Sequence, residues 1–328
     1  MPKFAANLTM LYNEYPFLNR FAAARADGFA AVEFLFPYAY PKEQIAEKLH
    51  ENGLRQVLHN LPAGNWEAGE RGIACLSDRT GEFQEGVGRA IEYATELACP
   101  QVNCLAGISP PRADRDRVRA TLAQNLKFAA DKLEAAGIRL LIEPINDKDI
   151  PGFWLNHADQ AVTLIDEVGS RNVFVQYDLY HQQRMSGELA ATFRRLKDRI
   201  AHIQVADNPG RNEPGTGEIN YPFLFDRLDR DGYTGWIGCE YKPNTTTSAG
   251  LGWAAAYLRR VSDVRQEGDG TGEWVLLASG SWARPWQGTL SRAATSYFST
   301  LVPKYRTSSS RPAALPVHLP LKSPERPM

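Results

Sequence analysis

RLLIEPIN, residues 139–146, runs three consecutive aliphatic residues into a glutamate, a proline and an amide. A continuous apolar run of this kind, without alternating polar residues, is typical of a strand buried in a parallel sheet. Glu143 stands where such a strand leaves its core, and a buried carboxylate is unfavourable unless it is paired, protonated or bound to metal. The stretch therefore predicts a buried strand that ends in a carboxylate with a function.

Seven further stretches have the same strand-like character. They lie at residues 3–11, 30–37, 55–60, 99–107, 173–181, 201–208 and 235–243. Between them, apolar residues recur every three or four positions, as at Val118, Leu122 and Leu126, which is typical of amphipathic helices. Several helical stretches end in a glycine just before the next strand, as expected for left-handed C-terminal caps; these are Gly28, Gly53, Gly137 and Gly232.

Eight strands that alternate with eight helices predict a parallel sheet covered by helices. Eight such units in roughly 250 residues match a closed (β/α)8 TIM barrel. The alternative is an open doubly wound sheet, but no GxGxxG motif follows the first strand to support it. We expect the barrel to occupy residues 1–262. Residues 263–328 do not continue the rhythm, and their Gly-, Ser- and Pro-rich composition predicts a disordered C-terminal extension.

The composition excludes several classes of partner. The 328 residues carry a formal net charge of −1, and the pI is near 6.6, so no basic surface indicates nucleic acid or an anionic membrane. No stretch approaches the roughly 18 apolar residues that a membrane span needs, and the start MPKF lacks a signal peptide. The four cysteines form no CxxC pair. We expect a cytoplasmic protein that acts on a small molecule, and both a monomer and a homo-oligomer are compatible with the sequence.

Polar residues interrupt four consecutive strands near their carboxyl ends: Glu143, Asp178, Gln204 and Glu240. In a TIM barrel these ends meet at one mouth, where active sites lie. Three carboxylates gathered there would repel one another, and a bound cation removes that repulsion. An all-oxygen ligand set suits Mg²⁺ or Mn²⁺ better than zinc. The alternative for each residue alone is an ion pair or a helix cap.

Two histidines are candidates for contact with a substrate. His59 ends a strand-like run, and His181 follows Asp178 by three residues, so each could donate a hydrogen bond or move a proton. The alternative for each is a structural role. His202 is expected to face the helices rather than the barrel mouth.

Six blocks of the sequence together resemble the hydroxypyruvate isomerase family of the xylose-isomerase-like barrels. They are ANLTMLYNEYPFL (6–18), HNLPAGNWEAGERGIA (59–74), LLIEPIN (140–146), QYDLYHQQRM (176–185), ADNPGRNEPGTGEINY (206–221) and GCEYKPNTTT (238–247). The resemblance extends from the start to about residue 258. It implies an intramolecular oxidoreductase that interconverts hydroxypyruvate and 2-hydroxy-3-oxopropanoate (tartronate semialdehyde) with a divalent metal.

The resemblance also implies roles for individual residues. The family's paired proton carriers correspond to Glu143 and Glu240, and the superfamily's metal ligands to Glu143, Asp178, Gln204 and Glu240. Many superfamily members have histidine where this chain has Gln204, which further disfavours zinc. A substrate carboxylate would need a cationic seat, for which Arg211, Lys242 and Arg71 are candidates. Residues 60–80 are long enough to fold over the mouth as a lid, or to form an ordinary surface loop.

Other functions are compatible with the same scaffold. A 2-oxo-tetronate isomerase or a ketose 3-epimerase would use the same metal and glutamate pair on another substrate. A DNA-repair endonuclease of this superfamily would need a histidine-rich zinc cluster and a basic face, which six histidines and a net charge of −1 argue against. A sugar-binding barrel without activity is a weaker alternative, because the carboxylate set is intact.

Overall fold

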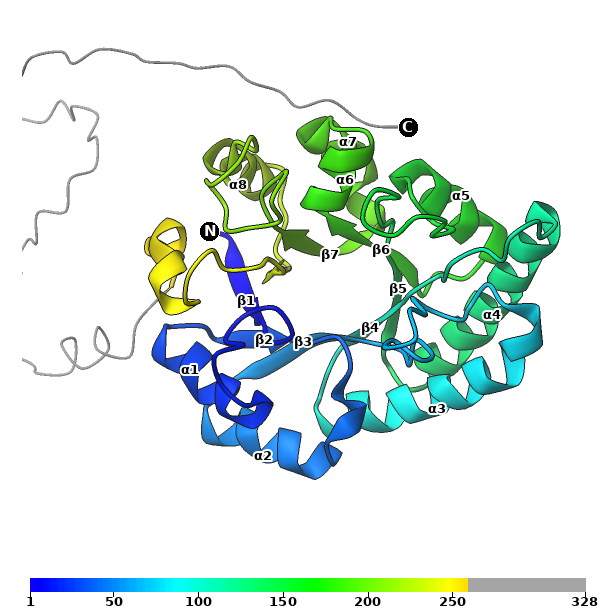
Figure 1. The fold of residues 1–328 in the computed structure, drawn as a ribbon, viewed down its shortest axis with the longest axis horizontal. Helices are drawn as coiled ribbons and strands as arrows, with labels where there is room; N and C mark the ends of the chain where they lie inside the picture. The colour runs from blue at the N-terminus through cyan, green and yellow to red at the C-terminus, as the bar shows by residue number, and fades with distance from the viewer. Residues whose placement is uncertain (259–328) are drawn as a thin grey trace, which may run out of the picture. The chain divides into compact units, whose positions relative to one another are not determined.

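The computed structural model describes residues 1–258, in which eight parallel strands close into a barrel (Figure 1). The strands are β1 (Lys3–Asn7), β2 (Ala31–Glu33), β3 (Arg55–Asn60), β4 (Gln101–Cys104), β5 (Arg139–Ile142), β6 (Val173–Asp178), β7 (Ile200–Val205) and β8 (Trp236–Cys239). Each pairs with its neighbours in chain order, and β8 pairs with β1. The predicted (β/α)8 barrel is therefore confirmed, and the open doubly wound sheet is excluded. The expected disordered extension, 263–328, lies outside the described residues.

Helices cover the outside of the barrel (Figure 1). The α-helices are α1 (Arg20–Ala26), α2 (Lys42–Glu51), α3 (Thr80–Glu96), α4 (Arg115–Ala135), α5 (Ala158–Val168), α6 (Leu179–Met185), α7 (Leu189–Leu196) and α8 (Tyr221–Arg230). Short 3-10 helices are η1 (Phe17–Asn19), η2 (Pro37–Ala39), η3 (Ser77–Arg79), η4 (Lys197–Arg199) and η5 (Ser248–Ala254). Within residues 1–258, β8 is followed by η5 rather than by the α-helix that the alternating pattern predicted.

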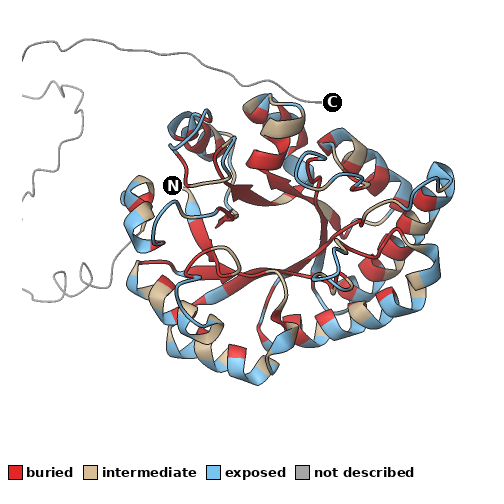
Figure 2. Cartoon of the chain, in the orientation of Figure 1, coloured by how far each residue is buried: buried red, intermediate tan, exposed pale blue. Residues whose placement is uncertain are grey.

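The helices have the apolar faces that the sequence predicted. In α4 the buried positions include Val118, Leu122 and Leu126, and this stripe packs toward the strands. Figure 2 shows buried residues along the strands and on the inward sides of the helices. The four glycines before strands have positive φ angles between 59° and 96°, which confirms their predicted role as helix ends.

The inside of the barrel changes character from its base to its mouth. A small apolar cluster of Ala5, Ala31 and Val57, packed against Trp236, lies near the amino ends of the strands. Toward the carboxyl ends of the strands, Glu33, His202 and Gln204 are all fully buried and polar. The apolar cluster lies between this polar layer and the solvent at the amino ends of the strands. It therefore keeps water from reaching the polar layer from the base of the barrel.

Candidate active site

The four polar residues predicted at the strand ends are all buried. Glu143 directly follows β5, Asp178 ends β6, Gln204 lies in β7, and Glu240 directly follows β8. Their exposed fractions are 4%, 2%, 0% and 6%, respectively. Side chains at the carboxyl ends of neighbouring parallel strands share one mouth. The four residues therefore lie at the end of the barrel that was predicted from the sequence.

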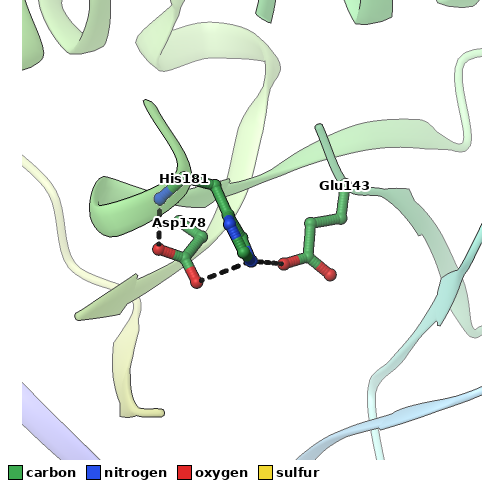
Figure 3. A group of neighbouring side chains, drawn as sticks. All are labelled: Glu143, Asp178 and His181. Atoms are coloured by element: carbon green, nitrogen blue, oxygen red, sulfur yellow. Dashed lines mark hydrogen bonds and ion pairs between the residues drawn. The ribbon is translucent and has the colours of Figure 1, made fainter. Parts of the chain in front are cut away.

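Glu143, Asp178 and His181 form a compact group (Figure 3). Nε2 of His181 lies 3.8 Å from Oε1 of Glu143 and 3.7 Å from Oδ2 of Asp178. One donor atom from each residue lies within 4.8 Å of the other two, which is close enough to hold a metal ion. Within residues 1–258 this is the single group of three such side chains.

The two oxygens of Asp178 have different surroundings. Oδ1 caps α6 by accepting hydrogen bonds from the backbone N–H groups of Tyr180 and His181. Oδ2 is buried and has no hydrogen-bond partner among residues 1–258. A buried carboxylate oxygen without a partner is unfavourable, and a cation satisfies it. The residues present therefore fit a divalent metal held by Glu143 and Asp178.

Glu240 is held by groups from three other parts of the barrel. Nη2 of Arg211 donates to its Oε1 at 2.7 Å, and Nδ2 of Asn7 donates to its Oε2 at 3.1 Å. The amide of Gln204 also donates to Oε2. Arg211 thereby reaches the carboxylates at the mouth, and its binding of a substrate carboxylate stays a prediction.

The loop after β7 carries Arg211 into the site, and Asp207 organises that loop. Oδ2 of Asp207 accepts from the backbone N–H groups of Gly215 and Gly217 at 2.8 and 2.9 Å. Its Oδ1 accepts from the N–H groups of Asn208 and Ile219. Four such bonds to one side chain hold the loop closed upon itself, so the backbone position of Arg211 is fixed before any substrate binds.

Burial changes the protonation of the mouth residues. It raises the pKa of Glu143 well above its usual range, and the neighbouring charges of Glu240 and Asp178 raise it further. Burial also raises the pKa of Glu240 to about 8, although Arg211 opposes the change. The pKa of Asp178 is raised by burial as well. A carboxyl group with a pKa of about 8, as at Glu240, exchanges protons near neutral pH, as a general acid or base must.

A buried carboxylate and imidazole lie beneath Glu240. Nε2 of His202 is 2.7 Å from Oε2 of Glu33, whose other oxygen accepts from Asn7 and Gln204. The expectation that His202 faces the helices is therefore wrong, because residues two apart on a strand share a face and Gln204 points inward. A Cβ at Gly238 would lie 2.3 Å from the Glu33 carboxylate, so β8 needs glycine there.

Gln204 bridges two carboxylates. Its Nε2 donates to Oε1 of Glu33 at 2.8 Å and to Glu240, while its Oε1 accepts from Nε2 of Gln176 at 2.6 Å. The side chain is thus next to the predicted ligand Glu240, with its amide nitrogen rather than its carbonyl oxygen toward that carboxylate.

The structure does not place His59 at the mouth. The strand pairing slips by one residue, since Val32 lies opposite Gln56 but Glu33 lies opposite Leu58. The slip reverses the faces at the end of β3. The His59 ring lies edge-on to Tyr38, which itself packs on Tyr93 of α3. His59 is therefore buried in the helix layer, where burial lowers its pKa to about 4.

The other two cationic candidates are also outside the carboxylate group. The side chain of Lys242 is exposed, and its backbone N–H donates to the carbonyl of Arg211. Arg71 lies 4.1 Å above the Trp66 ring, and its Nη1 donates to the carbonyls of Trp66 and Glu70. Arg71 therefore stabilises the 60–80 segment from within.

Three inward amides were missed from the sequence. Nδ2 of Asn103 donates to Oε2 of Glu143 at 3.0 Å, Asn7 contacts Glu240, and Asn60 lies opposite Asn103 in the sheet. All three are at or next to the last position of a strand. The rule that found the carboxylates, a polar residue closing an apolar run, would also have found them.

Comparison with known proteins agrees with this geometry. The profile of the xylose isomerase-like TIM barrel family matches residues 21–260. The chain belongs to this family. Hydroxypyruvate isomerase of Escherichia coli is 53% identical over 257 residues, which cover 78% of this chain and 100% of that protein. A 2-oxo-tetronate isomerase of Cupriavidus necator is 51% identical over 260 residues, 79% of this chain and 100% of that protein. The predicted resemblance to hydroxypyruvate isomerases is confirmed.

Solved structures have the same fold. A Brucella melitensis protein titled AP endonuclease, family 2, is 45% identical, with a TM-score of 0.78 over 79% of this chain and 100% of that chain. An L-ribulose 3-epimerase is 22% identical with a TM-score of 0.62, covering 80% of this chain and 88% of that chain. At that identity the epimerase supports the fold alone. Among residues 1–258, no helix has the length and apolar character that crossing a membrane requires.

Proposed function

We propose that this chain is a metal-dependent isomerase that interconverts hydroxypyruvate and tartronate semialdehyde. The observation that carries the proposal is the pair Glu143 and Glu240, two buried carboxyl groups with raised pKa values at one barrel mouth. The relatives named hydroxypyruvate isomerase and 2-oxo-tetronate isomerase support the same class of reaction. Isomerisation of a 2-oxo-tetronate is the second candidate, because that relative is nearly as similar.

The reaction moves a carbonyl group to the neighbouring carbon. One carboxylate removes a proton from C3 of hydroxypyruvate, which leaves an enediolate across C2 and C3. The other carboxyl group returns a proton to C2 while the hydroxyl proton on O3 passes to O2, so the carbonyl group moves to C3 and no external oxidant or reductant is needed. Glu240 suits these steps because a pKa of about 8 makes both its protonated and its ionised form accessible near neutral pH, and the raised pKa of Glu143 favours its protonated form.

The metal would be Mg²⁺ or Mn²⁺, held by Glu143 and Asp178 together with Gln204 and Glu240. When bound, such an ion stabilises negative charge that develops on substrate oxygens. Coordination through Oε1 of Gln204 would replace its hydrogen bond from Gln176. The lone buried Oδ2 of Asp178 is the atom that most supports a cation at this place.

Arg211 is proposed to bind the substrate carboxylate. Its Nη2 is held by Glu240, while its Nε is buried and has no hydrogen-bond partner among residues 1–258. Lys242, exposed at the rim, is the second candidate for this contact. His181, whose Nε2 lies between Glu143 and Asp178, is proposed to contact a substrate oxygen.

Two other functions fit the site less well. A multi-zinc endonuclease needs several histidine ligands, whereas the single candidate metal group in residues 1–258 contains one histidine and two carboxylates. A ketose 3-epimerase remains a candidate by fold, but a ketose has no carboxylate to engage Arg211. The four cysteines are free and buried, which supports a reducing compartment such as the cytoplasm.

One substrate panel tests the proposal. Purified protein is assayed with hydroxypyruvate, 2-oxo-tetronates, free ketoses and an abasic-site DNA duplex, each in EDTA and then with Mg²⁺ or Mn²⁺. We expect turnover of hydroxypyruvate that EDTA abolishes and the metal restores. Turnover limited to 2-oxo-tetronates would select the second candidate. Full activity in EDTA, or cleavage of DNA without isomerisation, would overturn the proposed function.

A further inference from the structure

Asn146 contacts the nitrogen of His181 that is not directed at Glu143 and Asp178. Nδ2 of Asn146 lies 2.6 Å from Nδ1 of His181, and both residues are buried, with exposed fractions of 0% and 2%. Asn146 follows Glu143 by three residues in the loop after β5. The contact therefore joins a loop residue to the one imidazole that lies between Glu143 and Asp178.

The orientation of the Asn146 amide is fixed by its other partners. Its Oδ1 accepts from the backbone N–H groups of Lys148 and Asp149 at 3.1 and 2.9 Å. Its Nδ2 donates to Oδ2 of Asp149 at 3.0 Å. Turning the amide over would set its NH₂ group against two N–H donors and its oxygen against a carboxylate. The turned amide would lose these three hydrogen bonds and change only its contact with His181. The NH₂ group therefore faces His181.

A hydrogen bond from Tyr180 also holds Asp149 in place. The hydroxyl of Tyr180 donates to the same Oδ2 of Asp149 at 2.8 Å. Although burial raises the pKa of Asp149, the hydrogen bonds from Asn146 and Tyr180 outweigh it and lower the pKa overall. Asp149 is thus an ionised acceptor that keeps the Asn146 NH₂ group directed as described.

This orientation determines which ring nitrogen of His181 carries the proton. A neutral imidazole has one N–H donor and one bare acceptor nitrogen, and the acceptor is Nδ1 because an NH₂ group faces it. The proton therefore resides on Nε2, the atom between Glu143 and Asp178. A metal-binding histidine has the opposite arrangement, since its second nitrogen donates to a carboxylate, carbonyl or water.

We infer that Asn146 is a positioning residue that fixes His181 as the Nε2–H tautomer, so that His181 donates a hydrogen bond to a substrate oxygen and does not bind the metal. The substrate part of this inference rests on the proposed function; the tautomer does not. A ring protonated on both nitrogens would set an N–H at Nδ1 against the Asn146 NH₂ group only 2.6 Å away, so the neutral ring is the form that fits this contact. Of the compact group Glu143, Asp178 and His181, only the two carboxylates then remain as metal ligands, together with the proposed ligands Gln204 and Glu240.

Nitrogen-15 NMR of the histidine rings measures the tautomer directly, without substrate. Histidine-labelled wild-type protein is compared with His181→Gln, which assigns the His181 signals among those of the six histidines. We expect His181 to show a protonated Nε2 and a bare Nδ1, in EDTA and equally at saturating Mg²⁺. A protonated Nδ1 with a bare Nε2, in either condition, would overturn the inference.

Asn146→Asp provides the matching variant. One carboxylate oxygen can still accept from Lys148 and Asp149, while the other presents an acceptor to Nδ1 of His181. The proton should then appear on Nδ1. Asn172→Asp is the control, since Asn172 is buried but donates to the carbonyls of Ala130 and Ile138, far from the mouth. The control should leave the His181 signals unchanged. An unchanged Nε2–H tautomer in folded Asn146→Asp would show that Asn146 does not select it.

Kinetics then separate the inference from the proposed function. In Asn146→Asp we expect kcat/KM for hydroxypyruvate to fall by about 10–100-fold, the usual effect of losing a group that orients a histidine. Mg²⁺ affinity should change much less than kcat/KM. If wild type has no isomerase activity, the proposed function fails while the NMR result still stands or falls alone. A loss of Mg²⁺ affinity equal to the loss of kcat/KM would instead make His181 a ligand.

Discussion

Arg211 and Glu240 form an ion pair at the barrel mouth, with 2.7 Å between Nη2 and Oε1. The guanidinium also lies close enough to Asp178 and Glu143 to lower the pKa of each, against the effect of burial. One cation from the loop after β7 therefore reduces the repulsion among three carboxylates. The same cation is the proposed seat of the substrate carboxylate, so its loss should affect both binding and protonation.

Arg211→Met should lower kcat/KM for hydroxypyruvate by roughly two to three orders of magnitude, because one partner of a buried charged pair is removed. It should also raise the pKa of Glu240 above about 8, since Arg211 lowers it, and shift the pH–rate profile upward. Steady-state kinetics across pH measure both effects. Arg194→Met, at a surface ion pair with Asp231, is the control and should behave as wild type. An unchanged KM and pH profile in Arg211→Met would contradict this role.

Asp207→Asn should disorder the loop that carries Arg211. An asparagine NH₂ would face two backbone N–H donors that a carboxylate oxygen now accepts. We expect the free energy of unfolding to fall by about 2 kcal/mol, and kcat/KM to fall by at least tenfold through displacement of Arg211. Denaturant unfolding and kinetics measure these separately. Wild-type kcat/KM in a destabilised variant would mean that the loop does not position Arg211.

Asp178→Asn separates the proposed metal-binding role of Asp178 from its role as the cap of α6. The asparagine oxygen can still accept from the N–H groups of Tyr180 and His181, so the start of α6 is retained. The negative charge at Oδ2 is lost, and Mn²⁺ affinity should fall while excess Mn²⁺ recovers part of the rate. Metal titration followed by calorimetry and by activity measures this. Wild-type activity at low Mn²⁺ would exclude Asp178 as a ligand.

The stability of metal-free protein should fall as pH rises between about 6.5 and 8. Glu240 has a pKa of about 8 when folded and an ordinary value of 4.5, so the folded state holds a proton that the unfolded state has released. Histidines with lowered pKa values, such as His59, change stability only below about pH 6.5. Saturating Mg²⁺ should reduce or reverse the trend, because it binds the ionised carboxylates. Thermal unfolding at several pH values, in EDTA and in Mg²⁺, measures it, and rising stability in EDTA over this window would contradict the proposed protonation.

The fold and the carboxylates were predictable because both depend on local sequence. Each strand lies in a stretch rich in apolar residues, and Glu143, Asp178 and Glu240 close three of those stretches. A parallel barrel brings all strand ends to one mouth, so no knowledge of tertiary contacts was needed. Arg211 was found for the same reason, since it follows the end of β7.

The histidines were not predictable because their faces depend on strand pairing. His59 turns outward through a one-residue slip between β2 and β3, which leaves no mark in the sequence. His202 was misplaced through its strand phase, although its position two residues before Gln204 contained the correct answer. The contact of Asn146 with His181 joins residues 35 positions apart and depends on the turn that Asn146 itself caps.

The central claim is that Glu143 takes part, with Glu240, in proton transfer at the substrate carbons, and solvent-deuterium exchange tests it most directly. Substrate is incubated in D₂O with wild type, Glu143→Gln or Glu240→Gln, each loaded with Mg²⁺, and the label in recovered substrate and product is measured. Wild type should incorporate deuterium, because proton abstraction gives an enediolate that exchanges with solvent. Both variants should lose most of the exchange, with turnover lower by roughly two to four orders of magnitude, and Mg²⁺ affinity should fall much less. Near-normal exchange and turnover in Glu143→Gln would contradict the account and leave Glu143 as a metal ligand only.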